Sequence, residues 1–234
     1  MAGSKVYRSL SGPGQLFDSF ASEYDAWFDF DGKSIFAIEV SAFRGILPTL
    51  PKPWLEIGVG SGRFAHCLGI ETGLDPSIKL LDMASKRGIN ILLGRGEAVP
   101  IANESLGTVF FIVTLCFVDS PLQVLREANR LLKEDGRVVL GLVLRESPWG
   151  EFYQVKKGKG HRFYKYANFY SYEETERLMG QAGFKTERVL STLFQRPGEV
   201  DHMEASQEGF SPNAGFTIIQ AGKYPRASSG YEED

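Results

Sequence analysis

Residues 54–65, WLEIGVGSGRFA, carry three glycines at alternate positions, Gly58, Gly60 and Gly62. Glycine lets a backbone approach a ligand closely, and a helix that follows such a loop offers unpaired N–H groups. A dinucleotide requires the spacing G-x-G-x-x-G, but Arg63 stands where the third glycine belongs. The loop also lacks the lysine of a Walker-type phosphate site. A nicotinamide oxidoreductase is therefore disfavoured.

Two carboxylates limit the chemical class of the ligand further. Glu56 precedes the glycines, where it would repel a pyrophosphate but could pair with a cation such as an ammonium group. Asp75 follows Gly58 by 17 residues, within GLDPS at the end of a predicted strand. A carboxylate at that point can accept hydrogen bonds from both hydroxyls of a ribose. The ligand is therefore expected to contain a ribose and a positive charge.

With these motifs the chain resembles the class I S-adenosylmethionine-dependent methyltransferases, particularly the branch of the ubiquinone and menaquinone biosynthesis enzymes. The likeness covers about residues 15–222. Its first motif, E-x-G-x-G-x-G, is matched from Glu56 to Gly62, and its ribose acid by Asp75. Three further stretches match the family in order, GRGEAVPIANESLGTVFFIVTLCFVDSP, RLLKEDGRVVLGLV and FASEYDAWF, the last resembling a helix that closes over the cofactor.

The resemblance implies S-adenosylmethionine as cofactor and a set of residues around it. Relatives usually have an acid for the adenine amino group where this chain has Arg95, so the adenine contact is expected from the backbone around Gly96, with Glu97 nearby. Relatives often have a histidine at the position of Phe117, so no general base is carried over there. The residues expected at the cofactor are Tyr24, Glu56, Gly58, Gly60, Gly62, Asp75, Pro76, Arg95, Gly96, Glu97 and Thr114.

Methyl transfer from a sulfonium depends on alignment of the nucleophile and exclusion of water, and a base is optional. Candidates for a catalytic role are Tyr24, Thr114 and His161. Each has a simpler interpretation, which is core packing of an aromatic helix, ordinary strand filling and a solvated loop, respectively. The residues expected to contact a substrate are Trp27, Phe117, Tyr153 and Tyr164.

The elements that must position these residues alternate regularly between 54 and 144. Strands are predicted in WLEIGV, TGLDP, INILLG, VFFIVTLCFV and DGRVVLGLVL, with amphipathic helices between them. Further strands are predicted near 186–194 and 215–222. This order implies a parallel sheet with helices on both faces. The resemblance makes it an α/β fold, a doubly wound, seven-stranded, mostly parallel, Rossmann-like sheet with a helical and aromatic cap.

The regular part is flanked and interrupted by segments of different composition. Residues 17–30 predict one helix with an aromatic face, and a second helix is predicted around 32–46. We expect an N-terminal helical cap at 1–50 and a methyltransferase domain at 51–222. A cap insertion rich in aromatic residues and lysine is expected at about 145–170, and a disordered tail at 223–234.

Composition limits the partners. The chain has 234 residues, 43% of them hydrophobic, a formal charge of −3 and a pI near 5.7. These values fit one domain without a basic field, so nucleic acid and membrane are not expected as partners, and oligomeric state is left open. Cys67 and Cys116 lack metal-site spacing and are predicted to be buried thiols. No metal is expected. The absence of a signal-peptide-like stretch predicts a cytoplasmic protein.

The functional prediction is an enzyme that methylates a small molecule. The alternative is a catalytically silent relative that binds the cofactor, or its demethylated product, as a sensor or partner subunit. The glycine loop is compatible with both, and a fold-level resemblance does not identify an acceptor.

Overall fold

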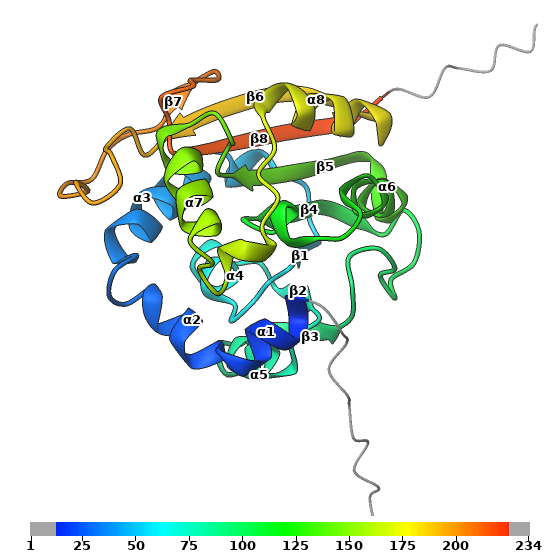
Figure 1. The fold of residues 1–234 in the computed structure, drawn as a ribbon. Helices are drawn as coiled ribbons and strands as arrows, with labels where there is room; N and C mark the ends of the chain where they lie inside the picture. The colour runs from blue at the N-terminus through cyan, green and yellow to red at the C-terminus, as the bar shows by residue number, and fades with distance from the viewer. Residues whose placement is uncertain (1–12, 225–234) are drawn as a thin grey trace, which may run out of the picture.

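The computed structural model describes residues 13–224 (Figure 1). Most of the tail predicted at 223–234 therefore lies outside the described residues. The described chain forms one mixed sheet in the order β3-β2-β1-β4-β5-β8-β6-β7. The strands are β1 Trp54–Ile57, β2 Thr72–Asp75, β3 Asn90–Leu93, β4 Leu106–Ile112, β5 Leu132–Leu142, β6 Phe184–Thr192, β7 Gln207–Glu208 and β8 Phe216–Lys223.

The predicted doubly wound, mostly parallel sheet is confirmed, with one difference in strand number. β1 to β5 pair in parallel, and the order changes direction at β1, which lies between β2 and β4. β8 pairs antiparallel with β5, and β6 pairs antiparallel with β8. The eighth strand, β7, has two exposed residues that pair with the end of β6. So short a polar strand has no hydrophobic period that could reveal it.

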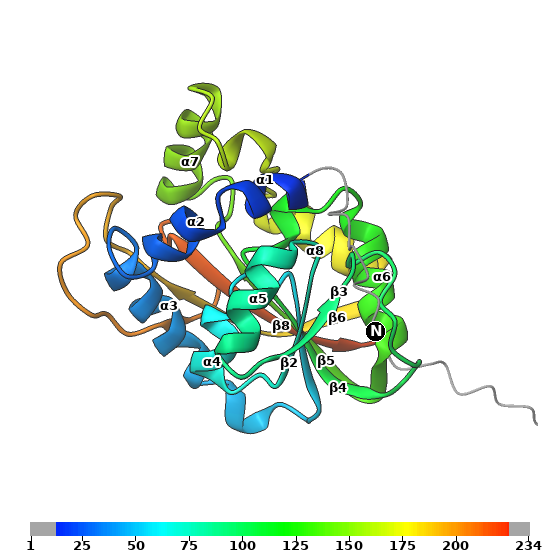
Figure 2. The ribbon, with the colours of Figure 1, turned by 90° about the horizontal axis from the view of Figure 1, so that it is seen from below.

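Helices cover both faces of this sheet (Figure 2). On one face lie α3 (Lys33–Arg44), α4 (Arg63–Leu68) and α5 (Ile78–Lys86), and on the other lie α6 (Pro121–Leu131) and α8 (Tyr172–Gln181). Each face has its own apolar layer, the first containing Phe43 and Phe64 and the second Val124 and Met179. Since successive strand residues point to opposite faces, a central strand between these layers, such as β4, is buried along its whole length.

The helix predicted at 17–30 is divided in two. α1 spans Pro13–Ser19 and α2 spans Ala21–Trp27. Phe20 between them leaves the helical backbone, at φ −123° and ψ 26°. Its ring packs edge-to-face on Phe163, and the guanidinium of Arg162 lies over it at 4.3 Å. Contacts with a distant segment therefore override a local helical pattern, and the prediction of one helix was wrong.

The segment at 145–170 contains a helix that the sequence analysis did not predict, α7 (Pro148–Gly158). It begins at Ser147, whose Oγ accepts a hydrogen bond from the backbone N–H of Gly150 at 2.9 Å. A serine followed by proline is a helix-start signal that aromatic crowding in this stretch obscured. Three short 3₁₀ helices complete the chain, η1 (Leu47–Thr49), η2 (Leu115–Phe117) and η3 (Tyr164–Tyr166).

The two cysteines differ. Cys116 is buried, as predicted, but Cys67 is exposed. On α4 the residues Phe64, Ala65 and Leu68 face the core, so Cys67 turns toward solvent and its predicted burial was wrong. None of the helices between residues 13 and 224 has both the length and the apolar character needed to cross a membrane. Within the same range, no group of three or more acidic, histidine and cysteine side chains is arranged to hold a metal ion.

Candidate cofactor and acceptor site

The carboxyl ends of β1, β2 and β4 bring the predicted residues together at one edge of the sheet. Glu56 is paired in register with Gly73 of β2 and Phe110 of β4. Asp75 ends β2, and Thr114 follows β4. This is the point where the strand order reverses, the usual ligand site of an open parallel sheet.

The three glycines of the loop are required for two different structural reasons. A Cβ atom at Gly58 would lie 2.2 Å from Cγ2 of Thr114, and one at Gly62 would lie 2.9 Å from Cβ of Ala84 on α5. Gly60 has φ +54°, and its N–H donates to Oδ2 of Asp75 at 2.9 Å. Gly58 and Gly62 therefore permit close packing of neighbouring elements, whereas Gly60 shapes the surface that a ligand would meet.

Glu56 is a buried carboxylate, and one of its two oxygens is unpartnered. Its exposed fraction is 1%, and its Oε2 atom has no hydrogen-bond partner among the described residues. Burial raises the pKa of Glu56 well above its usual value, and Asp75 adds to this, while a hydrogen bond from the backbone of Ala65 opposes it. An unpartnered buried carboxylate is costly, so the site fits a ligand with a cationic group at this point, such as the amino acid end of S-adenosylmethionine.

Asp75 is fixed by the backbone. Its Oδ2 accepts from Gly60 and its Oδ1 accepts from the N–H of Ser77 at 2.8 Å. Burial raises the pKa of Asp75 to about 6, although these two backbone bonds lower it. The bonds orient both oxygens and leave each a lone pair for a ribose hydroxyl. Pro76, also predicted at the cofactor, lies beneath α1, since a Cβ at Gly14 would sit 3.2 Å from it.

The residues expected near adenine follow β3. Arg95 forms ion pairs with Glu97 and with Asp119, so its charge is already engaged. The second carboxylate oxygen of Glu97 is buried without a partner among residues 13–224. Gly96 approaches Ile57 and Val124 so closely that its Cβ would lie about 3 Å from each. Glu97 therefore offers the unpartnered acceptor that an adenine amino group requires, and Arg95 offers none.

Helices α1 and α2 lie across the cofactor loop. Oδ1 of Asp18 accepts hydrogen bonds from Oγ of Ser77 at 2.5 Å and from the N–H of Lys79 at 3.0 Å. On α2, the ring of Tyr24 lies 3.5 Å from the Cβ position of Gly60. These helices therefore roof the loop at Gly60 and the segment that follows Asp75.

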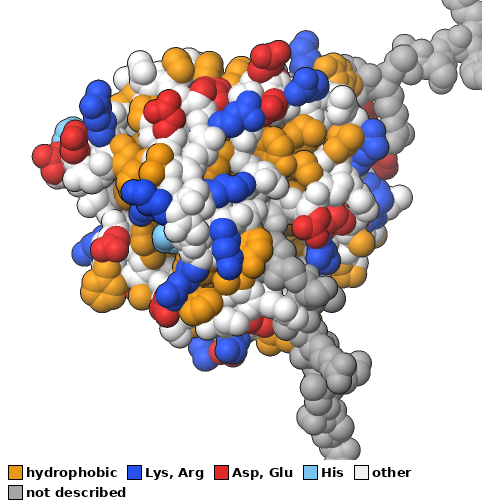
Figure 3. All heavy atoms as spheres, in the orientation of Figure 1, with side chains coloured by type: hydrophobic (Ala, Val, Ile, Leu, Met, Phe, Trp, Pro, Cys, Tyr) orange, Lys and Arg blue, Asp and Glu red, His pale blue; other side chains and the backbone are white. Residues whose placement is uncertain are grey.

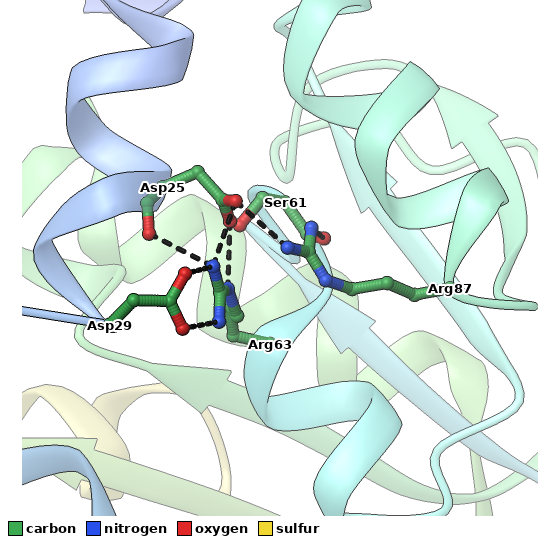
Figure 4. Close-up of polar contacts among 5 residues, drawn as sticks. All are labelled: Asp25, Asp29, Ser61, Arg63 and Arg87. Atoms are coloured by element: carbon green, nitrogen blue, oxygen red, sulfur yellow. Dashed lines mark hydrogen bonds and ion pairs between the residues drawn. The ribbon is translucent and has the colours of Figure 1, made fainter. Parts of the chain in front are cut away.

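An ion-pair network ties this roof to the loop (Figure 4). Arg63, on α4, donates to both oxygens of Asp25 and both oxygens of Asp29. Arg87 donates to Asp25 at 2.8 Å and to the backbone oxygen of Ser61 at 2.7 Å. Burial alone would raise the pKa of Asp25, but the hydrogen bonds, led by that from Arg63, lower it. Sequence analysis considered Arg63 only as the residue that stands in place of a motif glycine.

A cavity of about 820 Å³ opens from Glu56 and Gly58 beneath α2, α7 and η3. Tyr24 and all four predicted substrate residues, together with His161, border it; Thr114 and Asp75 do not. Sequence reasoning missed several of its walls because they come from elements whose ends it could not fix. The missed lining residues include Phe17, Glu39 and Trp149.

The three catalytic candidates differ in what they can do. Burial, assisted by Asp75 and Glu56, raises the pKa of Tyr24, which therefore stays a phenol and is no base. The hydroxyl of Thr114 lies 3.0 Å from the backbone oxygen of Ile112 and 3.3 Å from that of Gly58, so its proton is engaged in hydrogen bonding to the backbone. His161 has a buried Nδ1 atom with no partner in the described chain. Burial, with Lys156 and Arg162, lowers the pKa of His161, so its imidazole is neutral at pH 7 and can accept a proton.

Known proteins share this architecture. A sequence profile of a family described as a methyltransferase domain matches residues 55–140. The crystal structure of a Thermotoga maritima protein, described as an S-adenosylmethionine-dependent methyltransferase and possible histamine N-methyltransferase, is similar with a TM-score of 0.84. The two are 38% identical, and the match covers 90% of this chain and 99% of that one.

Two sequence relatives show how similar the chain is to individual proteins. An uncharacterised protein of Mycobacterium tuberculosis is 41% identical over 203 residues, which are 86% of this chain and 71% of that protein. The demethylmenaquinone methyltransferase of Thermotoga maritima is 29% identical over 139 residues, which cover 54% of this chain and 59% of that enzyme. The likeness to the menaquinone branch is therefore distant.

Proposed function

The chain belongs to the S-adenosylmethionine-dependent methyltransferases, with S-adenosylmethionine as cofactor, and from this membership we propose that it is an enzyme that methylates a small molecule. The observation that carries the proposal is the cavity that starts at Glu56 and Gly58 and continues under the cap. Its walls are largely aromatic, as in most small-molecule sites, and its volume of about 820 Å³ lies in their usual range.

The bound cofactor supplies a methyl group on a sulfonium, which already contains its leaving group. We assign to Glu56 the binding of the charged amino acid end, to Asp75 the ribose hydroxyls and to Glu97 the adenine amino group. These three contacts fix the cofactor along the edge of the sheet. The aromatic rings of Tyr24, Trp27 and their neighbours exclude water and align the acceptor, which is the main contribution such a displacement requires.

His161 is the base in this proposal when the acceptor loses a proton. It borders the cavity, its Nδ1 atom has no partner among the described residues, and it is neutral at pH 7. Its ring lies 4.7 Å from that of Tyr164, centroid to centroid, so the imidazole belongs to the aromatic wall. Tyr24 contributes a wall and a hydrogen-bond donor, and Thr114 supports the loop at Gly58.

Transfer of a labelled methyl group from S-adenosylmethionine to metabolite extracts tests the proposal. The description of the Thermotoga maritima protein makes histamine the first single compound to include. We expect a labelled small molecule that depends on the protein and disappears in the Asp75→Ala variant. Tight binding of S-adenosylhomocysteine without transfer to any fraction would instead identify a catalytically silent binding protein.

A further inference from the structure

Glu39 occupies a position that an apolar residue would normally fill. It lies on the buried face of α3 with Ile35, Ile38 and Phe43, and its exposed fraction is 5%. Glutamate is almost never buried to this extent without a partner, because desolvating a carboxylate is costly. A residue that weakens the core at this point requires a reason outside the fold.

No partner within the described chain satisfies Glu39. Between residues 13 and 224 no hydrogen bond or ion pair reaches its carboxylate, and burial raises its pKa to about 8. Among the other carboxylates that border the cavity, Glu23 is paired with Arg162, Asp31 is exposed, and Glu56 faces the cofactor loop. Glu39 is therefore a buried acid that faces the acceptor cavity with its hydrogen-bonding capacity unused.

The surroundings of Glu39 in the cavity are aromatic. The rings of Tyr153, on α7, and Tyr164, in η3, are 4.4 Å apart between centroids, and Tyr153 stacks parallel to Phe169. Burial raises the pKa of both tyrosines, and the negative charge of Glu39 adds to it. Glu39, Tyr153 and Tyr164 border the same cavity. A carboxylate beside several ring faces is the arrangement that binds an organic cation.

The cations around the cavity do not neutralise Glu39. Arg63 is bound to Asp25 and Asp29, and Arg162 to Glu23. Lys156 lies over the ring of Phe152 at 4.4 Å and is half-buried. Lysine and arginine side chains gather over α7 and η3 on the outer surface (Figure 3). Arg63, Lys156 and Arg162 border the cavity, but no ion pair joins any of the three to Glu39.

From this arrangement we propose that Glu39 binds a cationic nitrogen of the acceptor, so that the substrates of this protein are amines whose charged group enters the aromatic cavity. The inference rests on the proposed function and adds the chemical class of the acceptor. Glu39 is a specificity residue in this proposal, and the nitrogen it holds need not be the atom that receives the methyl group. An anionic acceptor has no positive charge that could pair with an ionised Glu39, so it is not expected to bind there.

The test uses the full chain saturated with S-adenosylhomocysteine and three pairs of compounds matched in shape. The pairs are benzylamine and benzyl alcohol, 2-phenylethylamine and 2-phenylethanol, and tryptamine and tryptophol. Calorimetry should show that at least one amine binds more tightly than its alcohol. Glu39→Gln should lower the affinity for that amine on the order of 100-fold, the effect of removing one partner of a buried charge pair. The affinity for the alcohol should stay unchanged. Glu151→Gln, an exposed glutamate of α7 outside the cavity, is the matched control.

A second measurement does not depend on how well the variant folds. At pH 7 the carboxyl of Glu39 is largely protonated, and a bound cation favours its ionised form. Binding of the amine to the wild-type protein should therefore release about one proton, measured as a dependence of the binding heat on the ionisation enthalpy of the buffer. The alcohol should release none. Tyr153 and Tyr164 face Glu39 and stay protonated, since their pKa values are raised, and so do not contribute.

Two results would overturn the inference. One is equal affinity for amines and alcohols without proton release. The other is amine binding by Glu39→Gln at wild-type affinity. Methyl transfer to a neutral or anionic acceptor, unchanged in Glu39→Gln, would contradict the amine class and leave the proposed function intact. Absence of transfer to every acceptor, with amine binding that depends on Glu39, would contradict the enzymatic function and not the binding site.

Discussion

The cofactor edge of the sheet and the cap that covers it are built in different ways. At the edge, backbone groups do the positioning: the N–H groups of Gly60 and Ser77 hold Asp75, and close approach at Gly58 and Gly62 sets the loop. In the cap, side chains do the positioning, through stacked rings and the ion pairs of Arg63. A site made by the backbone is tied to a short motif, whereas a site made by side chains can change its acceptor without changing its fold.

The comparison predicts its largest effect at Gly60. Gly60→Val should abolish binding of S-adenosylhomocysteine, because φ is +54° and a branched side chain would fill the space between the loop and Tyr24. Calorimetry measures the loss, and circular dichroism checks the fold. Gly69→Val is the matched control, since Gly69 has φ +74° and nothing lies within 4 Å of its Cβ position. A folded Gly60→Val protein with normal affinity would remove the loop from the cofactor site.

The second largest effect is expected for Asp75→Ala. The variant loses the acceptor for two backbone N–H groups and for the ribose. The free energy of binding S-adenosylhomocysteine should therefore become less favourable by roughly 1–3 kcal/mol. Asp82→Ala, an exposed aspartate on α5, controls for charge. Unchanged affinity in the Asp75 variant would show that Asp75 only organises the loop.

In the cap, the expected effect moves from the cofactor to the acceptor. Tyr164→Ala should lower kcat/KM for the acceptor by roughly 10- to 100-fold, because part of the cavity wall is lost. Affinity for S-adenosylhomocysteine should stay close to that of the wild type. Tyr166→Ala, in the same 3₁₀ helix but 46% exposed, should change neither quantity. If Tyr164→Ala reduces only thermal stability, the cap is structural and the acceptor binds elsewhere.

The pH dependence separates the two regions by their titrating groups. Ribose hydroxyls donate to an ionised Asp75, whose pKa is raised to about 6, so affinity for S-adenosylhomocysteine should fall as the pH drops through about 6. A methyl transfer that uses neutral His161 should fall only at lower pH, since the pKa of His161 lies below its usual value of 6.5. Asp75→Asn should flatten the first profile and His161→Gln the second. If each variant keeps the pH profile of the wild-type protein, these assignments are contradicted.

The smallest effects are expected in the ion-pair network. Asp25 and Asp29 bind the same guanidinium, but the side chain of Asp25 is 16% exposed and that of Asp29 is 57% exposed. Asp25→Asn should lower the free energy of unfolding by about 1–2 kcal/mol and speed the dissociation of S-adenosylhomocysteine. Asp29→Asn should change neither measurably, because solvent screens an exposed pair. Equal effects would mean that the network holds the cap as one unit.

The same difference between regions explains what the sequence could predict. Glu56, Gly60 and Asp75 lie at one edge of the sheet, as motif spacing predicts for the ends of parallel strands, and their contacts with the cofactor stay predictions. The strands of β1 to β5 followed from apolar runs between turn residues. The break at Phe20 and the helix α7 were missed because both depend on contacts between segments distant in sequence, such as Phe20 with Phe163.

Glu39 could not be identified for a related reason. A single glutamate in the helical pattern of 33–44 is expected to face solvent, and only the arrangement of α3, α7 and η3 around one cavity places it at the cavity wall. The structural role of Arg63 was hidden in the same way, since its two aspartate partners lie 34 and 38 residues earlier. Side-chain chemistry assembled from several elements leaves no signal at fixed spacing.

Helices α1 and α2, which roof the cofactor loop and the segment after Asp75 through Tyr24 and Asp18, also form part of the wall of the acceptor cavity through Phe17, Tyr24 and Trp27. One segment therefore contributes to both compartments. For the proposed methyl transfer we expect an ordered mechanism, in which the cofactor enters first and its demethylated product leaves last. S-adenosylhomocysteine should then inhibit competitively against S-adenosylmethionine and noncompetitively against the acceptor.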